Sequence, residues 1–260
     1  QKREFNISLA LSNAIARKSF QVYYQPVYNA KNNRFIGLEA LVRLKDSNLG
    51  MISPEEFIPL AEKDGSIIAI GEIVLEKVCK FVEQYHPEDF GIKSVNINLS
   101  TIQCMQENSI YKLTSITNDY RIPKGFINFE ITEQTGENIL NFENIIAECN
   151  KKGINFTLDN YGAGHCSQCN LLKYNYSSVK IDKSRIWNCE LDEKCQISLK
   201  HTVSMLTELG MTVIAQGVES QAQNDLLCEL GCENMQGFYF AKPLAQDDIM
   251  ELIRNKNTSL

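Results

Sequence analysis

The feature that most constrains the fold is an alternation of short β-branched and aromatic runs with longer amphipathic stretches along the whole chain. This order is typical of repeated βα units, in which a helix follows each strand. About eight such strands are expected, the number that closes a (β/α) barrel. They occupy residues 20–28, 34–44, 93–100, 125–133, 153–160, 177–182, 211–218 and 235–240. The sequence therefore predicts an α/β protein with a TIM-like (β/α)8 barrel.

The two predicted strands nearest the N-terminus should differ from the others in direction. They are joined only by "NAKNNR", which is too short for the crossover helix that two parallel strands need. A direct link of this length produces an antiparallel hairpin. We therefore expect a barrel with one antiparallel strand.

Helical segments fill most of the gaps between the predicted strands. The clearest start is at Ser53, a side chain suited to capping a helix, followed by Pro54 at the first helical position. Residues 67–85 carry an apolar face at helical spacing. Glycines that suit a C-cap close the segments 141–153 and 195–210.

Composition restricts the setting and the partners of the chain. The 260 residues carry a formal net charge of −6, which disfavours electrostatic binding to the phosphate backbone of DNA over a broad surface. No apolar run approaches the roughly 20 residues that a membrane-spanning helix needs, so no membrane contact is expected. No Pro, Gly or Ser-rich linker interrupts the chain, and its first residue is Gln1. We expect residues 1–260 to be a single domain cut from a longer multidomain signalling protein.

The nine cysteines favour a reducing compartment. Their number is odd and no secretory segment precedes them, so a disulfide framework is not expected and a cytoplasmic location is. Cys166 and Cys169 are the closest pair and follow His165. A zinc site would need a second cluster at metal-ligand spacing, and the sequence contains none. We interpret the pair as small loop residues rather than a metal or redox site.

Polar residues stand near the carboxyl ends of six predicted strands, at positions with apolar neighbours. They are Glu39, Asn98, Glu130, Asp159, Lys180 and Gln216. In a parallel barrel both faces of a strand are buried, so such residues project into the top of the barrel. Each one alone is more typical of a helix cap or a solvated side chain. Together they imply metal and phosphate, because several buried carboxylates cost too much without a cation. Oxygen ligands without His favour Mg²⁺ or Mn²⁺, with Ca²⁺ as an alternative, inhibitory occupant.

Several motifs follow one another along almost the whole chain. They are "YYQPV", "GLEALVRL", "SPEEFIPLAEKDG", "VNINLS", "FEITE", "VKIDKS", "AQGVES" and "MQGFYFAKP". In order and spacing they resemble the EAL family of cyclic di-GMP phosphodiesterases, which takes its name from residues such as Glu39, Ala40 and Leu41. The resemblance implies a (β/α) barrel with one antiparallel strand, a bacterial cytoplasmic setting, cyclic di-GMP as ligand and often a homodimer. It also implies an upstream sensor or diguanylate cyclase domain in the full protein.

The resemblance further assigns roles to individual residues. The metal-ligand positions are Glu39, Asn98, Glu130, Asp159 and Asn160. The catalytic positions are Lys180, Glu133 and Gln216, with Lys180 beside the attacking water and Glu133 supporting the loop after Asp159. The ligand-binding positions are Gln25, Arg43, Asp182, Glu219, Gln236 and Pro243. Arg43 has the planar geometry to clamp a phosphate, whereas Lys180 acts as a point charge.

Two of these positions depart from the family pattern. The family has Asp-Asp-Phe-Gly where this chain has Asp159, Asn160, Tyr161 and Gly162, and it has Ala-Glu-Gly-Val-Glu where this chain has Gln216 in place of the first glutamate. Both changes replace a carboxylate by an amide, which keeps the size but supplies no negative charge and accepts no proton near neutral pH. Two closely spaced dications repel strongly and need negative charge from the protein to stay together. Because both amides remove such charge, we expect one metal rather than two.

Three functions remain open at this point. The first is a cyclic di-GMP receptor with little or no phosphodiesterase activity, favoured by the two amides. The second is an active metal-dependent phosphodiesterase that produces linear pGpG. The third is a protein interaction module that has lost the nucleotide, which the retained pocket residues Gln25, Arg43, Asp182 and Glu219 disfavour.

Overall fold

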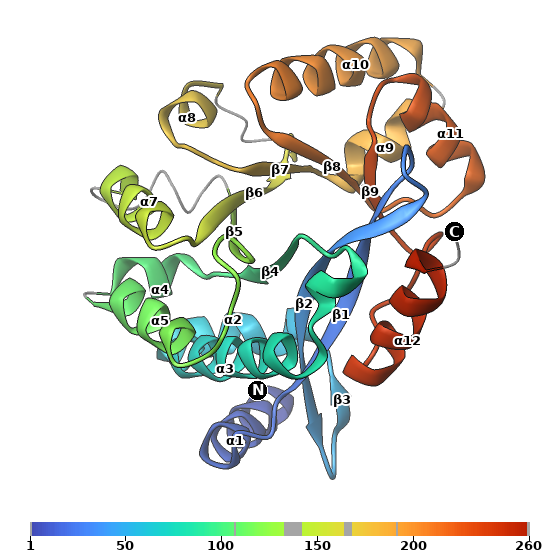
Figure 1. The fold of residues 1–260 in the computed structure, drawn as a ribbon. Coiled ribbons are helices and arrows are strands. Elements are labelled where there is room, and N and C mark those ends of the chain that lie inside the picture. Colours follow the sequence, from blue (N-terminus) through green and yellow to red (C-terminus); the bar gives the residue numbers. More distant parts are fainter. Residues whose placement is uncertain (1, 107, 133–141, 164–167, 191, 259–260) are drawn as a thin grey trace.

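The computed structural model describes residues 2–106, 108–132, 142–163, 168–190 and 192–258. Its strands surround a common centre and its helices lie outside them (Figure 1). The strands are β1 (Gln21–Asn29), β2 (Arg34–Asp46), β3 (Gly50–Ile52), β4 (Ser94–Asn98), β5 (Ile127–Thr132), β6 (Asn155–Tyr161), β7 (Ser178–Ile181), β8 (Thr212–Gln216) and β9 (Asn234–Gln236).

Eight of these strands close the predicted barrel. Their order is β1-β9-β8-β7-β6-β5-β4-β2, and pairing of β1 with β2 completes the circle. β1 runs antiparallel to both of its neighbours, β2 and β9, whereas the pairs from β2–β4 round to β8–β9 are parallel. The prediction of a (β/α)8 barrel with one antiparallel strand is confirmed.

Two strand predictions were wrong in detail. β3 was not predicted; it pairs antiparallel with the end of β2 after a turn in which Asp46 accepts hydrogen bonds from the backbone. The predicted strand over 235–240 ends at Gln236. A Cβ at Gly237 would lie 1.9 Å from the carbonyl oxygen of Val218, so the chain passes too close to the β8 loop to continue as a strand.

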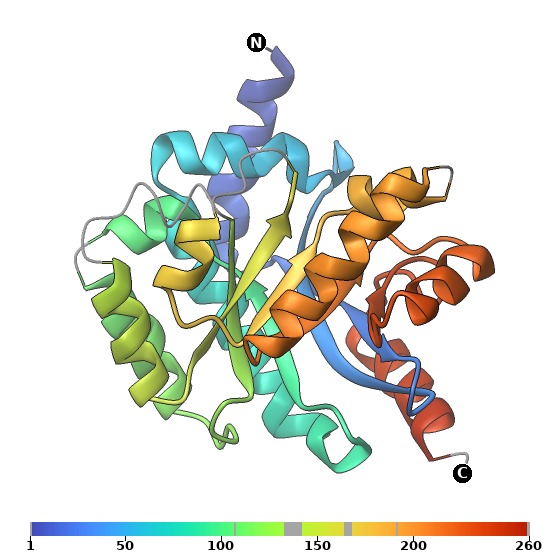
Figure 2. The same ribbon diagram turned by 90° about the horizontal axis from the view of Figure 1, so that it is seen from above.

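Helices cover the outside of the barrel. They are α1 (Lys2–Arg17), α2 (Pro54–Asp64), α3 (Ile67–Tyr85), the 3-10 helix η1 (Pro87–Phe90), α4 (Thr101–Met105), α5 (Ser109–Asn118), α7 (Phe142–Lys151), α8 (Gln168–Lys173), α9 (Lys183–Cys189), α10 (Glu193–Glu208), α11 (Gln221–Glu229) and α12 (Gln246–Asn257). The two labelled ends of the chain lie on opposite sides of the molecule (Figure 2).

The predicted helix signals operate as expected. The Ser53 side chain accepts a hydrogen bond from the backbone of Glu55, Pro54 opens α2, and Gly65 ends it with φ 80°. Such a cap contributes about 1 kcal/mol. The predicted span of 67–85 coincides with α3, whose buried face packs on the barrel.

The apolar core lies between the barrel and its helices. Phe129, Phe156 and Val179 on the strands and Leu75 and Val78 on α3 are at most 1% exposed. Each such side chain contributes about 1.5 to 3 kcal/mol by leaving water. Because this layer supplies the hydrophobic stabilisation, the interior of the barrel is free to carry polar side chains.

Candidate functional site

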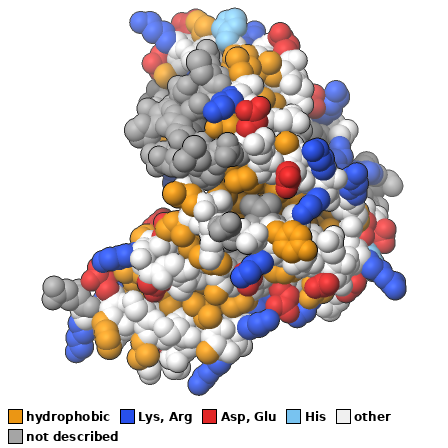
Figure 3. All heavy atoms as spheres, turned by 90° about the vertical axis from the view of Figure 1, so that its left-hand side faces the viewer, with side chains coloured by type: hydrophobic (Ala, Val, Ile, Leu, Met, Phe, Trp, Pro, Cys, Tyr) orange, Lys and Arg blue, Asp and Glu red, His pale blue; other side chains and the backbone are white. Residues whose placement is uncertain are grey.

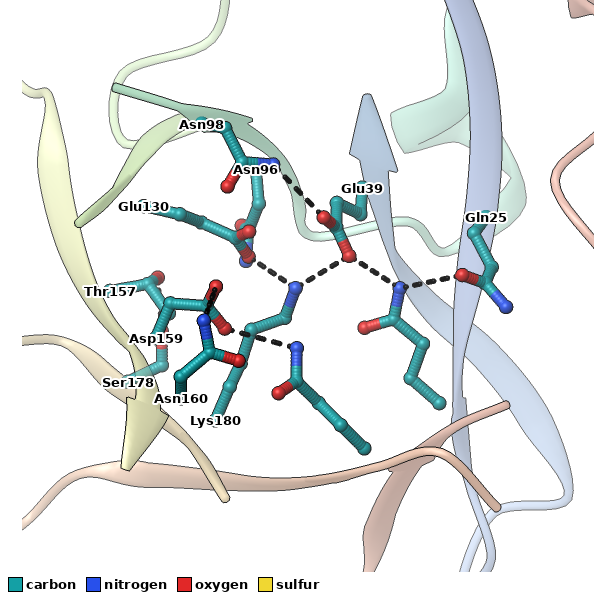
Figure 4. A network of polar contacts seen from close by, with 12 residues as sticks. Gln25, Glu39, Asn96, Asn98, Glu130, Thr157, Asp159, Asn160, Ser178 and Lys180 are labelled. Carbon is teal, nitrogen blue, oxygen red and sulfur yellow. Dashed lines mark hydrogen bonds and ion pairs between the residues drawn. The ribbon is translucent and has the colours of Figure 1, made fainter. Parts of the chain in front are cut away.

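The candidate site lies inside the barrel, at the carboxyl ends of the parallel strands. Period-two alternation turns one face of each strand inward, and the inward residues at these ends are polar. Pairing of β4 with β5 sets Asn98 opposite Glu130, and pairing of β8 with β9 sets Gln216 opposite Gln236. All six polar residues singled out in the sequence converge there (Figure 4).

Lys180 joins two carboxylates at the centre of the site. Its Nζ atom lies 2.6 Å from Oε2 of Glu39 and 2.6 Å from Oε1 of Glu130. The three side chains come from β7, β2 and β5, and they are 0%, 8% and 1% exposed. A fully buried ammonium group is tolerable only because these carboxylates compensate its charge. We call Glu39, Glu130 and Lys180 the ionic half of the site.

Amide side chains hold both carboxylates of the ionic half. Glu39 accepts hydrogen bonds from Nδ2 of Asn98 at 3.0 Å and from Nε2 of Gln236 at 2.7 Å. Oε1 of Glu130 also accepts one from Nδ2 of Asn96 at 2.7 Å. Oε2 of Glu130 is buried and has no hydrogen-bond partner among the described residues. This oxygen is therefore left for a donor or a cation.

Burial and crowding shift the pKa values in this group. Burial raises the pKa of Glu130 to about 8, and the charges of Glu39 and Asp159 act in the same direction against the attraction of Lys180. Burial would also raise the pKa of Glu39, but Lys180 and the hydrogen bonds hold it below its usual range. Burial would lower the pKa of Lys180, yet the surrounding carboxylates raise it. Lys180 stays charged, and Glu130 holds its proton most readily.

Asp159 is held differently, by the two amides that depart from the family pattern. Its Oδ1 atom accepts a hydrogen bond from Nε2 of Gln216 at 3.0 Å, and its Oδ2 atom accepts one from Nδ2 of Asn160 at 3.1 Å. A carboxylate at either position would have no proton to donate and would repel Asp159. We call Asp159, Asn160 and Gln216 the amide half of the site. Burial raises the pKa of Asp159, and the charge of Glu39 adds to the effect.

The loop after Asp159 has a backbone that only some residues accept. Asn160 has φ 57° and Gly162 has φ 88°, and the amide of Ala163 donates to the carbonyl of Asn160 at 3.2 Å. Asn is among the few side chains that adopt this left-handed region readily. The end of β6 is therefore irregular between Leu158 and Tyr161, and the Asn160 side chain turns back to Asp159.

A cavity of about 350 Å³ opens above these side chains. Four of the six predicted ligand-binding residues line it: Gln25, Asp182, Glu219 and Gln236. Glu39, Asn160 and Gln216 lie in the same wall. Four predicted ligand-binding positions and two predicted metal-binding positions, Glu39 and Asn160, thus line one concave site, the usual form of a small-molecule pocket.

Arg43 and Pro243 lie elsewhere. Arg43 borders a second, mainly apolar cavity of about 360 Å³, next to Asn98 and against α2 and α3. Its guanidinium group lies 5.6 Å from the ring centroid of Tyr23. Pro243 lines neither cavity.

Some predictions fall where the structure gives no description. Glu133 and Cys166 lie outside the described residues, and so does the side chain of Cys169. The described cysteine side chains, those at 79, 104, 149, 189, 195, 228 and 232, are free thiols.

Sequence reasoning missed Asn96. This residue is 3% exposed and supports Glu130, and it lies two positions before Asn98 on the same face of β4. The alternation in "VNINLS" was the signal that could have identified it. Lys183 and Phe238 also line the upper cavity. Lys183 is the first residue of α9, and Phe238 follows β9 in a loop whose path the sequence does not specify.

The polar character continues below the site. Thr157 and Ser178 share a buried hydrogen bond of 2.6 Å beneath Lys180, and Asn128 is 7% exposed. A cavity of about 560 Å³ at the opposite end of the barrel is lined largely by Asn, Ser and Thr side chains. Branched apolar side chains usually fill this part of a (β/α)8 barrel.

The fold and the site define a (β/α)8 barrel with an acidic, lysine-bridged centre at the carboxyl ends of its strands. Residues 8–243 match the EAL domain family, and the chain belongs to that family. The signalling protein YkoW of Bacillus subtilis is 32% identical over 251 residues, which are 96% of this chain and 31% of that protein. The bifunctional diguanylate cyclase/cyclic di-GMP phosphodiesterase MucR of Pseudomonas aeruginosa is 29% identical over 92% of this chain and 35% of its own length. The chain thus spans about a third of the length of these curated relatives.

Solved structures show the same likeness. The PaMucR phosphodiesterase in complex with c-di-GMP superposes with a TM-score of 0.87 at 28% identity, covering 94% of this chain and 99% of the other. The EAL enzyme Bd1971, in its form bound to cAMP and cyclic di-GMP, gives a TM-score of 0.88 at 25% identity, over 97% of this chain and 68% of the other. No helix in the described ranges is long and apolar enough to cross a membrane.

Proposed function

We propose that this chain is a cyclic di-GMP receptor with little or no phosphodiesterase activity. The observation that carries the proposal is the amide half, where both carboxylate oxygens of Asp159 already accept hydrogen bonds from Gln216 and Asn160. Protein donors take the place that a second cation would need. The site is therefore shaped for recognition, and it lacks the negative charge that would hold paired metals beside a phosphate.

The likeness to solved complexes supports cyclic di-GMP as the ligand. PaMucR was solved with c-di-GMP, and Bd1971 with cAMP and cyclic di-GMP. In this chain Gln25, Asp182, Glu219 and Gln236 line the cavity above Lys180, with Arg43 beside a neighbouring cavity. Polar side chains can recognise the edges of the guanine bases, and Lys183 in the cavity wall offers a charge for a phosphate.

The oxygen donors fit one hard divalent cation. Glu39, Glu130 and Asp159 offer three carboxyl groups beside the one positive charge of Lys180, and Glu130 would release its proton when a cation binds. Oε2 of Glu130 has no hydrogen-bond partner among the described residues. No group of three or more His, Cys, Asp or Glu side chains is arranged to hold a metal in the described ranges, so Asn98 would have to complete the ligand set. Mg²⁺ or Mn²⁺ would suit these oxygens, with Ca²⁺ as an inhibitory alternative. When bound, the cation would polarise a phosphate oxygen and lower the pKa of a water molecule.

The alternative is an active phosphodiesterase that opens cyclic di-GMP to linear pGpG. The ionic half favours it, because Lys180 is held rigidly between Glu39 and Glu130, where it could position a water molecule. Under this alternative Gln216 and Asn160 would be tolerated without a large loss of rate. The described site offers no carboxylate in their place, and we rank the alternative second.

Two measurements separate these functions. Calorimetry with cyclic di-GMP, in EDTA and then in Mg²⁺ or Mn²⁺, should show binding in both conditions. Incubation with metal should yield little or no pGpG. The double reversal Asn160→Asp with Gln216→Glu should raise the rate of hydrolysis by at least about 10-fold, because losing a residue that supports a metal ligand already costs about 10 to 100-fold in metal affinity or activity. Absence of binding in every condition would exclude the receptor, and steady turnover by the native chain would establish the enzyme.

We also propose that residues 1–260 form one EAL domain of a longer cytoplasmic signalling protein that works as a homodimer. The relatives YkoW and MucR, about three times as long as the matched segment, support an origin in a longer protein. The face on the left of Figure 1 carries hydrophobic side chains around an indentation (Figure 3). The exposed Met105, Tyr111 and Leu172 belong to α4, α5 and α8 on this side. Sedimentation with and without ligand tests the dimer.

A further inference from the structure

Helix α9 lies against the loops that follow β6 and β8, the two strands whose ends carry the amide half. Asp182, in the wall of the upper cavity, caps it by accepting a hydrogen bond from the backbone of Ser184 at 2.9 Å. Ile186 and Cys189 are each 1% exposed and fix the helix to the core. Its remaining side chains are therefore held in register with the loops that follow β6 and β8.

Arg185 of α9 packs on the loop after β6. A Cβ at Gly162 would lie 2.5 Å from Cδ of Arg185 and 3.1 Å from its Nη1 atom, so the arginine side chain lies directly over this glycine. Gly162 follows Asn160 by two residues and has φ 88°. Only glycine leaves room for this contact in that backbone conformation.

The loop after β8 is held in the same way. A Cβ at Gly217 would lie 2.5 Å from Cβ of Lys183, and Gly217 has φ 72°. Nε1 of Trp187 donates a hydrogen bond to the carbonyl oxygen of Gly217 at 2.9 Å. The bonded carbonyl belongs to the peptide between Gly217 and Val218, so this bond fixes the backbone one residue beyond Gln216. Trp187 is 40% exposed, and Nζ of Lys183 lies 5.2 Å from the centroid of its ring.

Arg185 also connects this arrangement to the surface helix α10. Its Nη2 atom donates to Oγ of Ser198 at 2.9 Å and lies 3.4 Å from Oγ1 of Thr202. The guanidinium group therefore has fixed partners on α10 while its methylene groups cover Gly162. One short helix contacts both amide-bearing loops and the outer layer of the barrel.

We infer that Arg185 and Trp187 are positioning residues for ligand binding, acting through Asn160 and Gln216 on Asp159. This inference rests on the proposed receptor function and deepens it. Trp187 fixes the backbone at Gly217, directly after Gln216, and Arg185 fixes the turn at Gly162, two residues after Asn160. The two donors then meet the two oxygens of Asp159 without a metal to align them. Substituting Trp187 or Arg185 should let the amide of Gln216 or of Asn160, respectively, move away from Asp159. Ligand binding should then weaken, although neither substituted residue contacts the amide half directly.

A double-mutant cycle tests the inference by calorimetry with cyclic di-GMP. Trp187→Phe keeps a ring but loses the N–H group, and it should weaken binding about 5 to 10-fold, the value of one hydrogen bond. In a Gln216→Ala background the same change should weaken binding less than 2-fold, because the residue on which Trp187 acts is gone. Arg185→Met keeps the methylene contact with Gly162 and should weaken binding about 2 to 5-fold. Phe5→Leu changes an exposed aromatic on α1 that has no part in the site, and as the control it should leave binding unchanged.

A ligand-free measurement keeps this inference separate from the receptor proposal. The side-chain amide signal of Gln216 in NMR spectra should shift or broaden in Trp187→Phe, and that of Asn160 should do so in Arg185→Met. Both signals should stay in place in Phe5→Leu. If the native chain binds no cyclic di-GMP, the receptor proposal fails. The amide signals would still show whether Trp187 and Arg185 position Gln216 and Asn160. Unmoved amide signals, or equal losses from Trp187→Phe in both backgrounds of the cycle, would overturn the inference.

Discussion

The two halves of the site neutralise their carboxylates by different means. In the ionic half a formal charge does so, since Lys180 lies 2.6 Å from both Glu39 and Glu130. In the amide half the side-chain hydrogen bonds to Asp159 come from the neutral amides of Gln216 and Asn160, at 3.0 and 3.1 Å, and Lys180 attracts Asp159 without an ion-pair contact among the described residues. Removing the charge of Lys180 would leave Glu39 and Glu130 buried without a counter-charge. The amides of Gln216 and Asn160, by contrast, can be exchanged for carboxylates of the same shape. The ionic half should thus govern folding, and the amide half should govern chemistry.

The largest effect is expected from Lys180→Met. This change leaves Glu39 and Glu130 buried without a counter-charge, and the free energy of unfolding should fall by about 3 to 5 kcal/mol, the cost of breaking a buried pair. Urea unfolding in EDTA measures it. The control Lys200→Met removes an exposed lysine of α10 and should cost less than about 0.5 kcal/mol. A loss below about 1 kcal/mol for Lys180→Met would mean that the ionic half does not support the fold.

A smaller and metal-dependent effect is expected when the amide half is made acidic. In EDTA, Asn160→Asp with Gln216→Glu replaces two hydrogen-bond donors to Asp159 by two repelling charges, and the unfolding free energy should fall by about 1 to 3 kcal/mol. Mn²⁺ should restore the loss in this variant and change the native chain less. The pair Gln84→Glu with Asn188→Asp makes the same charge change at exposed positions. Equal destabilisation of both pairs would show that net charge, not the site, is responsible.

The pH dependence of stability isolates the ionic half further. Glu130 has a pKa of about 8 in the folded protein, whereas in the unfolded chain it ionises near pH 4.5. Between these values the folded state binds more protons, so in EDTA the unfolding free energy should fall as pH rises, by about 2 kcal/mol from pH 6.5 to pH 8.5. The lowered pKa of Glu39 acts in the opposite sense only near and below pH 4.5. Glu130→Gln should flatten the profile, and a slope that survives this change would assign it to other groups.

The sequence predicts the barrel and the ionic half better than it predicts the surroundings of the amide half. Strand alternation and the short "NAKNNR" link were enough for the barrel and its antiparallel strand, because period and connection length act locally. The convergence of Glu39, Glu130 and Lys180 followed from their places at strand ends, since closure of the barrel brings those ends together.

Contacts between loops could not be predicted from the sequence. The approach of Gly237 to Val218 ends β9 early, and nothing in "MQGFYF" encodes the position of the other loop. For the same reason Trp187 and Arg185 could not be connected with Gln216 and Asn160. The sequence identified the substitutions to amides, but their donation to Asp159 depends on the paths of two loops that are far apart in the chain.

The smallest effect is expected at Asn160, where backbone and side chain oppose each other. Asn160→Gly loses the hydrogen bond to Asp159 but suits φ 57°, so stability should stay within about 0.5 kcal/mol of the native value. Asn160→Ala loses the same bond and meets the steric cost of the left-handed region, so it should be less stable than the glycine variant by about 1 kcal/mol. Thermal unfolding of the two variants measures this difference. If they are equally stable, the turn does not hold Asn160 in that conformation, and the amide half would then depend on Gln216 alone. If the difference is found, the loop backbone is set independently of the side chain, which explains how a carboxylate could be exchanged for an amide here without disturbing the barrel.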